Sequence, residues 1–383
     1  MSNKKIKRRT ATGPGIPSKE GESPEIRKLR LERQYLSQPF ITEGSVFCFS
    51  LLDQIKGPSI MVNDYKIADL VVYRKNGVLY GATSGDENHL FFMDKKKMIV
   101  DVGIVEAKTI NSGSMSIGYD SMLYFAATDA DNNTIILKHD LDTDYTDQYP
   151  LNYSGDIEET GLVIEKDMVV GAVSNSWDKN IYFLTANGKI YQFDISKKII
   201  HEIFELESGF SKSICADGSG NLFMVLSGGI LSRLNVNDRK LAKSTSRVPS
   251  QKGREYLAGA EKIVYENGKI YGCTSQDSYL FSYVVESDKV FNFGKPDDNY
   301  DIRSFIVEKD GRIYGVTSTK GRGLGHLFLY GENGFRDLGN IAGFMPLTGW
   351  CNEPSKMVVG NDGEIFISDG DNRSKLFLYF PKI

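Results

Sequence analysis

The sequence predicts an all-β fold: a seven-bladed β-propeller closed by an N-terminal strand, with a basic N-terminal arm that contains a short helix. Three observations predict it: a recurring strand–turn–strand unit, a spacing of 43 to 51 residues between units, and an unpartnered strand-like segment ahead of the first unit. We expect two parts, a partly disordered arm over residues 1–43 and the propeller over residues 44–383.

The recurring unit is a short hairpin followed by an aromatic strand. Its clearest copies start at Asn76, Asn267, Asp310 and Asp362, and each begins with Asn-Gly or Asp-Gly. These dipeptides accept the positive φ of a tight hairpin turn, and the flanking runs of Val, Ile, Tyr and Phe have the length of strands. Three copies place a glycine in the second strand, which suits a crowded position near a propeller axis: Gly81, Gly272 and Gly315.

Seven such units cover the chain. Their first strands are expected near residues 67, 110, 160, 209, 260, 303 and 354. In the third unit, residues 161–206 contain more strand than four short ones need, so either one strand is long or a hairpin is inserted. The last unit has three strands. We expect the apolar run 45–52 to supply the fourth strand on its outer side and so to remove an open edge.

The chain thus resembles the seven-bladed propeller superfamily, in the broad kelch-like and WD-repeat-like sense, over about residues 45–383. It lacks the Trp-Asp ending of WD repeats and the paired glycines of kelch units. It is also loosely similar to the streptogramin lyase propellers. The resemblance implies a binding site at one mouth of the central channel, formed by loops between second and third strands and between blades.

Composition favours a reduced intracellular compartment. The four cysteines form no Cys-x-x-Cys pair, and Cys215 and Cys273 lie in apolar runs that are typical of buried free thiols. No run of about 18 apolar residues occurs, and no apolar segment follows the charged N-terminus as an export signal would require. We expect a cytoplasmic protein, or a nuclear one in a eukaryote.

The charge is unevenly distributed. Residues 1–40 hold ten basic and four acidic residues, a charge of +6, so the other 343 residues carry −10 of the total of −4. Residues 1–23 are polar and rich in Gly, Ser and Pro, and Ser23-Pro24 precedes a predicted helix over 25–36. The arm is expected to contact an acidic partner protein or the acidic propeller itself. Its basic cluster could also contact nucleic acid. Its candidate contact residues are Lys4, Lys5, Lys7, Arg8, Arg9, Arg27, Arg30 and Arg33.

Candidate binding residues fall into two sets. Counting back eight residues from each turn glycine, or its equivalent, gives inner-strand positions that would ring the channel mouth: Asp69, Glu159, Lys212, Ala260, Arg303 and Ser355. Their charges could hold a polar ligand or satisfy one another. Connections between elements carry residue types that anchor interfaces: Trp350, Arg254 and Tyr256. A tryptophan packed under its own loop is the alternative.

Two histidines occupy the same repeat position. His89 and His326 both precede Leu-Phe at the end of a polar loop, so they could approach one ligand or metal. The streptogramin lyase resemblance implies a divalent metal held by His and Glu near the axis, which makes His326 with Glu353 the pair to test. The alternative is that strand-end hydrogen bonds fix both histidines. No other cofactor is predicted.

The main functional hypothesis is a non-catalytic scaffold or accessory subunit of an intracellular complex, which engages partner proteins through the arm and one propeller face. It rests on the intact repeat, the charge asymmetry and the lack of a nucleophile elbow, a phosphate-binding loop, a zinc motif or a dinucleotide fingerprint. The alternative is a metal-assisted lyase or hydrolase acting on a small polar or sugar-like substrate at the channel mouth. Ligand sensing without turnover is a third.

Overall fold

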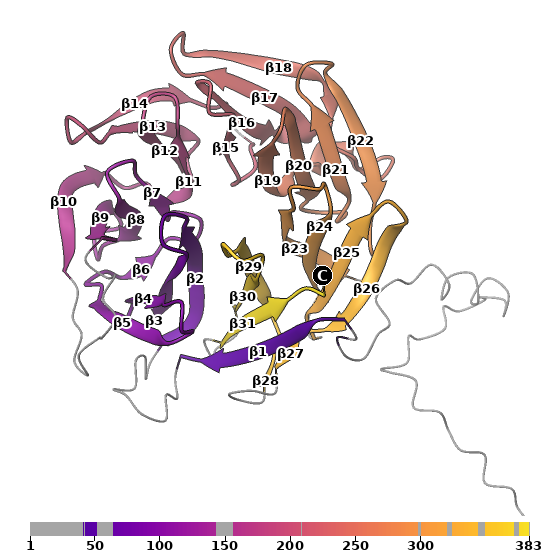
Figure 1. Ribbon diagram of the computed structural model, residues 1–383. Helices are drawn as coiled ribbons and strands as arrows, with labels where there is room; N and C mark the ends of the chain where they lie inside the picture. Colours follow the sequence, from indigo (N-terminus) through magenta and orange to yellow (C-terminus); the bar gives the residue numbers. More distant parts are fainter. Residues whose placement is uncertain are drawn as a thin grey trace, which may run out of the picture.

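The computed structural model describes residues 41, 43–51, 64–142, 156–207, 209–297, 300–319, 324–343, 349–370 and 375–382. These residues form seven sheets arranged around a central axis, which confirms the predicted all-β seven-bladed propeller (Figure 1). No helix in the described ranges is long and apolar enough to cross a membrane. The predicted arm helix and all eight arm contact residues lie outside the described residues.

Each blade is an antiparallel sheet of four strands, except that the inner strand of blade two is split into two short pieces. Blade one contains β2 (Asp64–Tyr73), β3 (Val78–Gly85), β4 (His89–Met93) and β5 (Ile99–Ile104). Blade two contains β6 (Thr109–Ile110), β7 (Ser116–Ile117), β8 (Met122–Thr128), β9 (Thr134–Asp140) and β10 (Ile157–Ile164). Blade three contains β11 (Val169–Asn175), β12 (Asn180–Thr185), β13 (Lys189–Asp194) and β14 (Ile199–Glu205). Blade four contains β15 (Cys215–Ala216), β16 (Asn221–Leu226), β17 (Ile230–Asn235) and β18 (Lys240–Arg247).

Blades five and six follow the same order. Blade five contains β19 (Ala260–Glu266), β20 (Lys269–Thr274), β21 (Leu280–Val284) and β22 (Lys289–Gly294). Blade six contains β23 (Tyr300–Val307), β24 (Ile313–Thr319), β25 (His326–Gly331) and β26 (Gly334–Asn340). Two 3-10 turns, η1 (Ser227–Gly229) and η2 (Glu255–Leu257), and a small ribbon of β27 (Ala342–Gly343) and β28 (Gly349–Trp350) lie outside the blade sheets.

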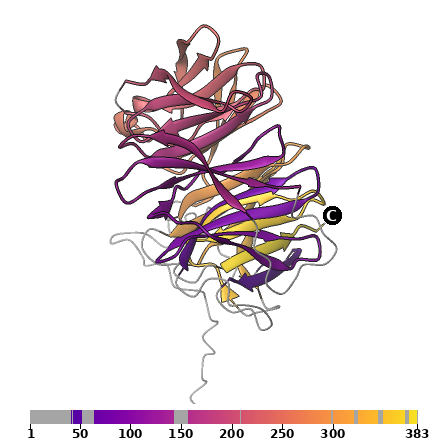
Figure 2. The same cartoon turned by 90° about the vertical axis from the view of Figure 1, so that its left-hand side faces the viewer.

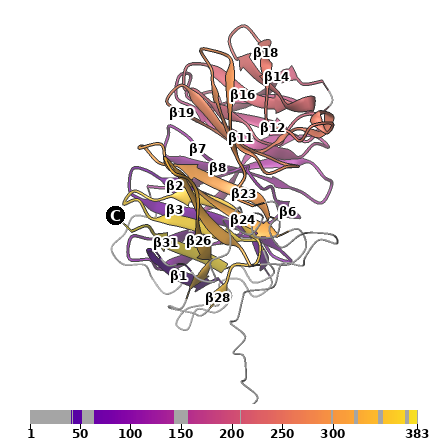
Figure 3. The same cartoon turned by 90° about the vertical axis from the view of Figure 1, so that its right-hand side faces the viewer.

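Blade seven joins the two ends of the chain, as the sequence predicted. It contains β29 (Pro354–Val359), β30 (Ile365–Asp369), β31 (Lys375–Phe380) and, on its outer side, β1 (Ser45–Ser50). β1 pairs antiparallel with β31 from Ser45 opposite Phe380 to Ser50 opposite Lys375. In the side views the indigo strand lies against the yellow strands (Figures 2 and 3). The closure removes the open edge that β31 would otherwise present.

The predicted start of the third unit near residue 160 is wrong. That segment, β10, is the outermost strand of blade two and pairs with β9, whereas the inner strand of blade three is β11. The surplus strand noted in residues 161–206 is explained by this shift. Glu159 therefore lies exposed on an outer strand and not at the channel.

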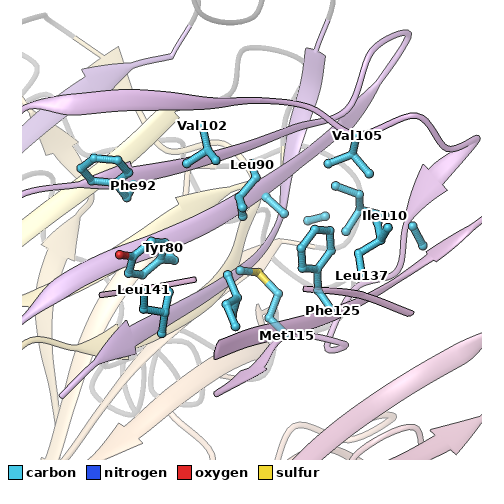
Figure 4. Packing of buried hydrophobic residues seen from close by; sticks show 14 of the residues in the cluster. Tyr80, Leu90, Phe92, Val102, Val105, Ile110, Met115, Phe125, Leu137 and Leu141 are labelled. Carbon is cyan, nitrogen blue, oxygen red and sulfur yellow. The ribbon is translucent and has the colours of Figure 1, made fainter. Parts of the chain in front are cut away.

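Apolar side chains pack between the faces of neighbouring blades. Between blades one and two, Tyr80 and Phe92 of the first blade meet Phe125 and Leu137 of the second in one buried cluster (Figure 4). All four cysteines are free and buried, as expected for Cys215 and Cys273. Burial raises the pKa of Cys48 to about 11, which keeps it as an unreactive thiol at neutral pH.

The second-strand glycines make room for a phenylalanine. In the register of their blades, Gly272 lies opposite Phe281 and Gly315 lies opposite Phe328, and a Cβ built at either glycine would overlap the opposing ring. Gly81 and Phe91 repeat the arrangement in blade one. The crowding predicted at these glycines is therefore real. Its cause is a cross-strand aromatic ring within the same blade and not the propeller axis.

Candidate functional site

The central channel contains a cavity of about 610 Å³ bounded by the inner strands. Seven charged residues line it: Asp69, Lys212, Glu261, Lys262, Arg303, Glu353 and Lys356. Most of the residues that line it lie at or near the starts of the inner strands, and we call this side of the propeller the entry face. The predicted positions Asp69, Lys212 and Arg303 thus meet in one cavity, together with Glu353 and Ser355.

β-bulges in the inner strands explain which side chains reach the channel. A register shift occurs near the start of the inner strand in five blades, for example between Ala260 and Lys262 in β19 and between Ile302 and Ser304 in β23. A bulge inserts one residue and re-aims the side chains around it. Counting from the turn glycine predicted Ala260 at this level, but the bulge brings Glu261 and Lys262 to the cavity instead.

Hydrogen bonds across the channel wall tie neighbouring blades together. Asp69 Oδ2 accepts the N–H of Met115 from blade two at 3.0 Å, and Ser304 Oγ accepts the N–H of Met357 from blade seven at 3.1 Å. Lys356 Nζ lies 3.5 Å from Asp69 Oδ1 and so links blade seven to blade one. Asp69 and Lys356 therefore have a structural role in the wall of the channel.

Lys262 differs from the other charged residues that line the cavity in the surroundings of its ammonium group. Its Nζ donates to Ser304 Oγ at 3.0 Å and to the Met357 carbonyl at 3.4 Å, and it lies 5.6 Å from the centre of the Phe305 ring. Its partners are neutral groups. Burial, with Lys356 nearby, lowers the pKa of Lys262 to about 8.

A second hollow opens beside the channel between blades four and five. This side groove has a volume of about 430 Å³ and shares Lys212 and Glu261 with the channel cavity. Its apolar lining residues are Phe210, Leu226, Tyr256, Leu257, Ala258 and Ala260. The two hollows thus form one continuous surface on the entry face.

The turn that borders the side groove exposes apolar side chains on a fixed backbone. Tyr256 is 71% exposed and Leu257 40% exposed. In η2 the Leu257 N–H donates to the Arg254 carbonyl at 2.9 Å, and the Arg254 guanidinium lies 3.4 Å from Asp277 Oδ1 in the adjoining β20–β21 loop. Arg254 and Tyr256, which the sequence predicted as interface residues, therefore have different roles. Arg254 stabilises the turn, and the Tyr256 side chain faces solvent.

Trp350, the third predicted interface residue, lies away from the side groove, in β28. It is half-buried in β28, its carbonyl accepts a hydrogen bond from Lys375 Nζ at 2.8 Å, and the ribbon that contains it lies against β1 in blade seven (Figure 1). Trp350 thus belongs to the closure of the propeller and is not part of the side groove of blades four and five.

The two histidines lie within their blades and do not line the channel cavity. His89 Nδ1 is 3.2 Å from Asp101 Oδ1 of β5, and His326 Nδ1 is 3.2 Å from Asp337 Oδ1 of β26. Of the three residues expected near the channel for a metal-assisted reaction, only Glu353 lines it. The described residues contain no group of three or more His, Cys, Asp or Glu side chains placed to hold a metal ion.

Each of these aspartates shapes a bulge in the outer strand. Asp337 Oδ1 accepts the N–H of Gly339 at 2.9 Å, and Asp101 Oδ1 accepts that of Gly103 at 3.0 Å. Blade five forms the same bond with Asn292 and Gly294 at 2.8 Å, where Tyr279 stands in place of histidine. A recurring Asp/Asn-x-Gly about twelve residues after the histidine position was the sequence signal for this arrangement.

Substitution of Asp337 tests this structural role. Asp337→Ala should lower the free energy of unfolding by about 1–3 kcal/mol, because the Gly339 N–H and His326 lose a buried acceptor. Asp337→Asn should lose less than half of that, because blade five builds the same bulge with asparagine. Urea unfolding of the three chains measures both values. Equal losses for the two substitutions would contradict this assignment.

The comparisons with known proteins agree with the observed architecture. No protein-family model matches the chain, and no curated protein matches it. Among solved structures, the WD40 β-propeller domain of Doa1 has a TM-score of 0.58 and 10% identity, over 86% of this chain and 96% of that one. At 10% identity, the similarity to this domain concerns the fold alone. The extracellular domain of a protein described as a hybrid two-component system of B. thetaiotaomicron has a TM-score of 0.57 and 11% identity, over 88% of this chain and 39% of that one.

Proposed function

We propose that the protein is a non-catalytic β-propeller that binds a partner protein through its entry face and serves as a scaffold or accessory subunit of a larger intracellular complex. Propellers commonly mediate protein interactions, and the WD40 domain of similar fold is consistent with such a role. The observation that carries the proposal is the fixed turn that exposes Tyr256 and Leu257 beside the side groove. The four buried, free cysteines agree with a reducing compartment.

The side groove suggests the chemistry of the partner. Its apolar lining suits one large apolar side chain of the partner, held against Tyr256. Lys212 at the junction with the channel is exposed, and its side chain contacts no described acidic group, so an acidic residue beside that apolar side chain would complement it. The arm, with its charge of +6 over residues 1–40, provides a second contact for an acidic surface of the same partner.

Affinity capture from native lysate tests the proposal. A double variant, Tyr256→Ala with Leu257→Ser, should retain at least about tenfold less of a stoichiometric partner, since an exposed aromatic anchor is worth about 2 kcal/mol or more at an interface. A chain that begins at Ile41 should retain less of the same partner because it lacks the basic arm. Quantitative mass spectrometry of the retained proteins gives both numbers.

Trp177→Ala provides the matched control. Trp177 is 54% exposed but lies in the β11–β12 turn, on the face opposite the entry face because strands alternate in direction. Capture should be unchanged by this substitution. Equal capture by the double variant, the Trp177 variant and the unmodified chain would reject the entry face as the interface, and a chain that retains no stoichiometric protein would reject the scaffold role.

A further inference from the structure

The channel cavity brings together more basic than acidic side chains, although the propeller as a whole is acidic. Its basic residues are Lys212, Lys262, Arg303 and Lys356, and its acidic residues are Asp69, Glu261 and Glu353. Asp69 is fully engaged: it accepts the N–H groups of Leu70 and Met115 and pairs with Lys356. The charge of Lys356 is thereby balanced within the wall of the channel.

The ammonium group of Lys262 has no acidic hydrogen-bond partner among the described residues. It is half-buried, and its hydrogen-bond acceptors are a serine hydroxyl and a backbone carbonyl. A charge withdrawn from water is costly unless an opposite charge compensates it. Burial, with Lys356 nearby, lowers the pKa of Lys262 to about 8. A negative group in the cavity would supply a counter-charge beside the ammonium group.

Arg303 and Lys212 add two further donors to the same cavity. Arg303 Nε donates a hydrogen bond to Ser318 Oγ at 2.9 Å, which fixes the position of the guanidinium group. The other N–H groups of the guanidinium are available to a ligand. Both Arg303 and Lys212 are exposed, and neither forms an ion pair with a described residue. Donors from blades four, five and six thus surround one hollow.

We propose that the channel is a binding site for a small anion, with a carboxylate or phosphate group held by Lys262 and Arg303 and approached by Lys212 from the mouth. The cavity, of about 610 Å³, has the size of known small-molecule sites. Glu261 and Glu353 are exposed and line the same cavity. They disfavour a highly charged polyanion and favour a compound with one anionic end and a neutral or cationic polar remainder.

Calorimetric titration of the full chain with succinate and, separately, with inorganic phosphate tests the proposal and distinguishes the two anion chemistries. At least one should bind saturably at millimolar concentration. Lys262→Met keeps the aliphatic stem and removes the charge, and it should weaken binding by about tenfold or more. Lys289→Met is the control: Lys289 is exposed on β22, the outermost strand of the same blade, and its loss should leave binding unchanged.

Thermal unfolding without ligand shows whether each variant is folded. Should Lys262→Met fail to fold, Arg303→Gln carries the test, because Arg303 is an exposed bulge residue. Absence of saturable binding of both anions, or equal affinity of the unmodified chain and the folded charge-removed variant, would overturn the proposal. The Tyr256/Leu257 variant should bind the anion normally, since neither residue lines the channel cavity, so failure of the partner proposal and failure of this one are distinguishable.

The proposed site also predicts a pH dependence. Succinate affinity should fall as pH rises from 7 to 9, because Lys262 loses its proton near pH 8 and with it the charge that binds the anion. The other charged groups that face the cavity are Asp69, Lys212, Glu261, Arg303, Glu353 and Lys356. The carboxylates of succinate are already ionised throughout this range. The Lys262→Met variant should show no such fall.

Discussion

A chain that begins at residue 52 is expected to lose most of its stability, because it lacks the closing strand β1. Cys48 and Leu51 are buried, and Phe47 packs edge-on against Phe380 with ring centroids 5.8 Å apart. Removal of these side chains from the core should cost on the order of 5 kcal/mol or more, which is comparable with the total stability of many domains. The unpaired edge of β31 should also promote aggregation. Urea unfolding and light scattering measure the two effects.

A chain that begins at Ile41 is the matched control. It lacks the basic arm but keeps β1, the 3.0 Å ion pair between Glu43 and Arg336, and the hydrogen bond from the Tyr379 hydroxyl to the Glu43 carbonyl. Its unfolding midpoint should match that of the full chain. A peptide of residues 43–51 added to the shorter chain should restore part of its stability by pairing with β31. If the two truncated chains were equally stable, β1 would not be the element that closes the propeller.

Local turn chemistry and spacing were enough to predict the propeller. Asn-Gly and Asp-Gly turns at Asn76, Asn267 and Asp310 do lie between first and second strands, and the segment 45–50 does close the last blade. The third unit was misplaced because β10 is long and lies just ahead of β11, and strand patterning alone cannot say which of two neighbouring sheets a strand joins.

The candidate site was predicted only in part, for a reason that lies in the backbone. Asp69, Lys212 and Arg303 were found by counting from turn glycines, but Lys262 and Lys356 were missed. Bulges in β19 and β29 shift the register by one residue or more, and no residue type marks them in the sequence. The counting rule therefore found the correct level of the blades, but in β19 it predicted Ala260 where the bulge places Glu261 and Lys262 at the cavity.

A single methyl group added at Gly315 is expected to destabilise the propeller strongly. Gly315 is buried in β24 opposite Phe328, a fully buried ring that also packs edge-on against Phe335 at 5.6 Å. A Cβ at Gly315 would overlap that ring, which is closed in on its other side and cannot move away without disturbing the core of blades five and six. Gly315→Ala should therefore lower the free energy of unfolding by about 3 kcal/mol, at the upper end of the usual cost of overpacking.

Gly331→Ala in the same blade separates crowding from the general effect of replacing a strand glycine. A Cβ at Gly331 would have only the Arg312 side chain nearby, at 4.0 Å. Alanine there should be neutral or should stabilise by up to about 1 kcal/mol, because it restricts the unfolded chain. Combining Gly315→Ala with Phe328→Leu should recover part of the loss by removing the overlapping ring edge. A Gly315→Ala chain as stable as the Gly331→Ala chain would show that the aromatic ring, and with it the repeated Gly–Phe pair of the blades, does not constrain this position.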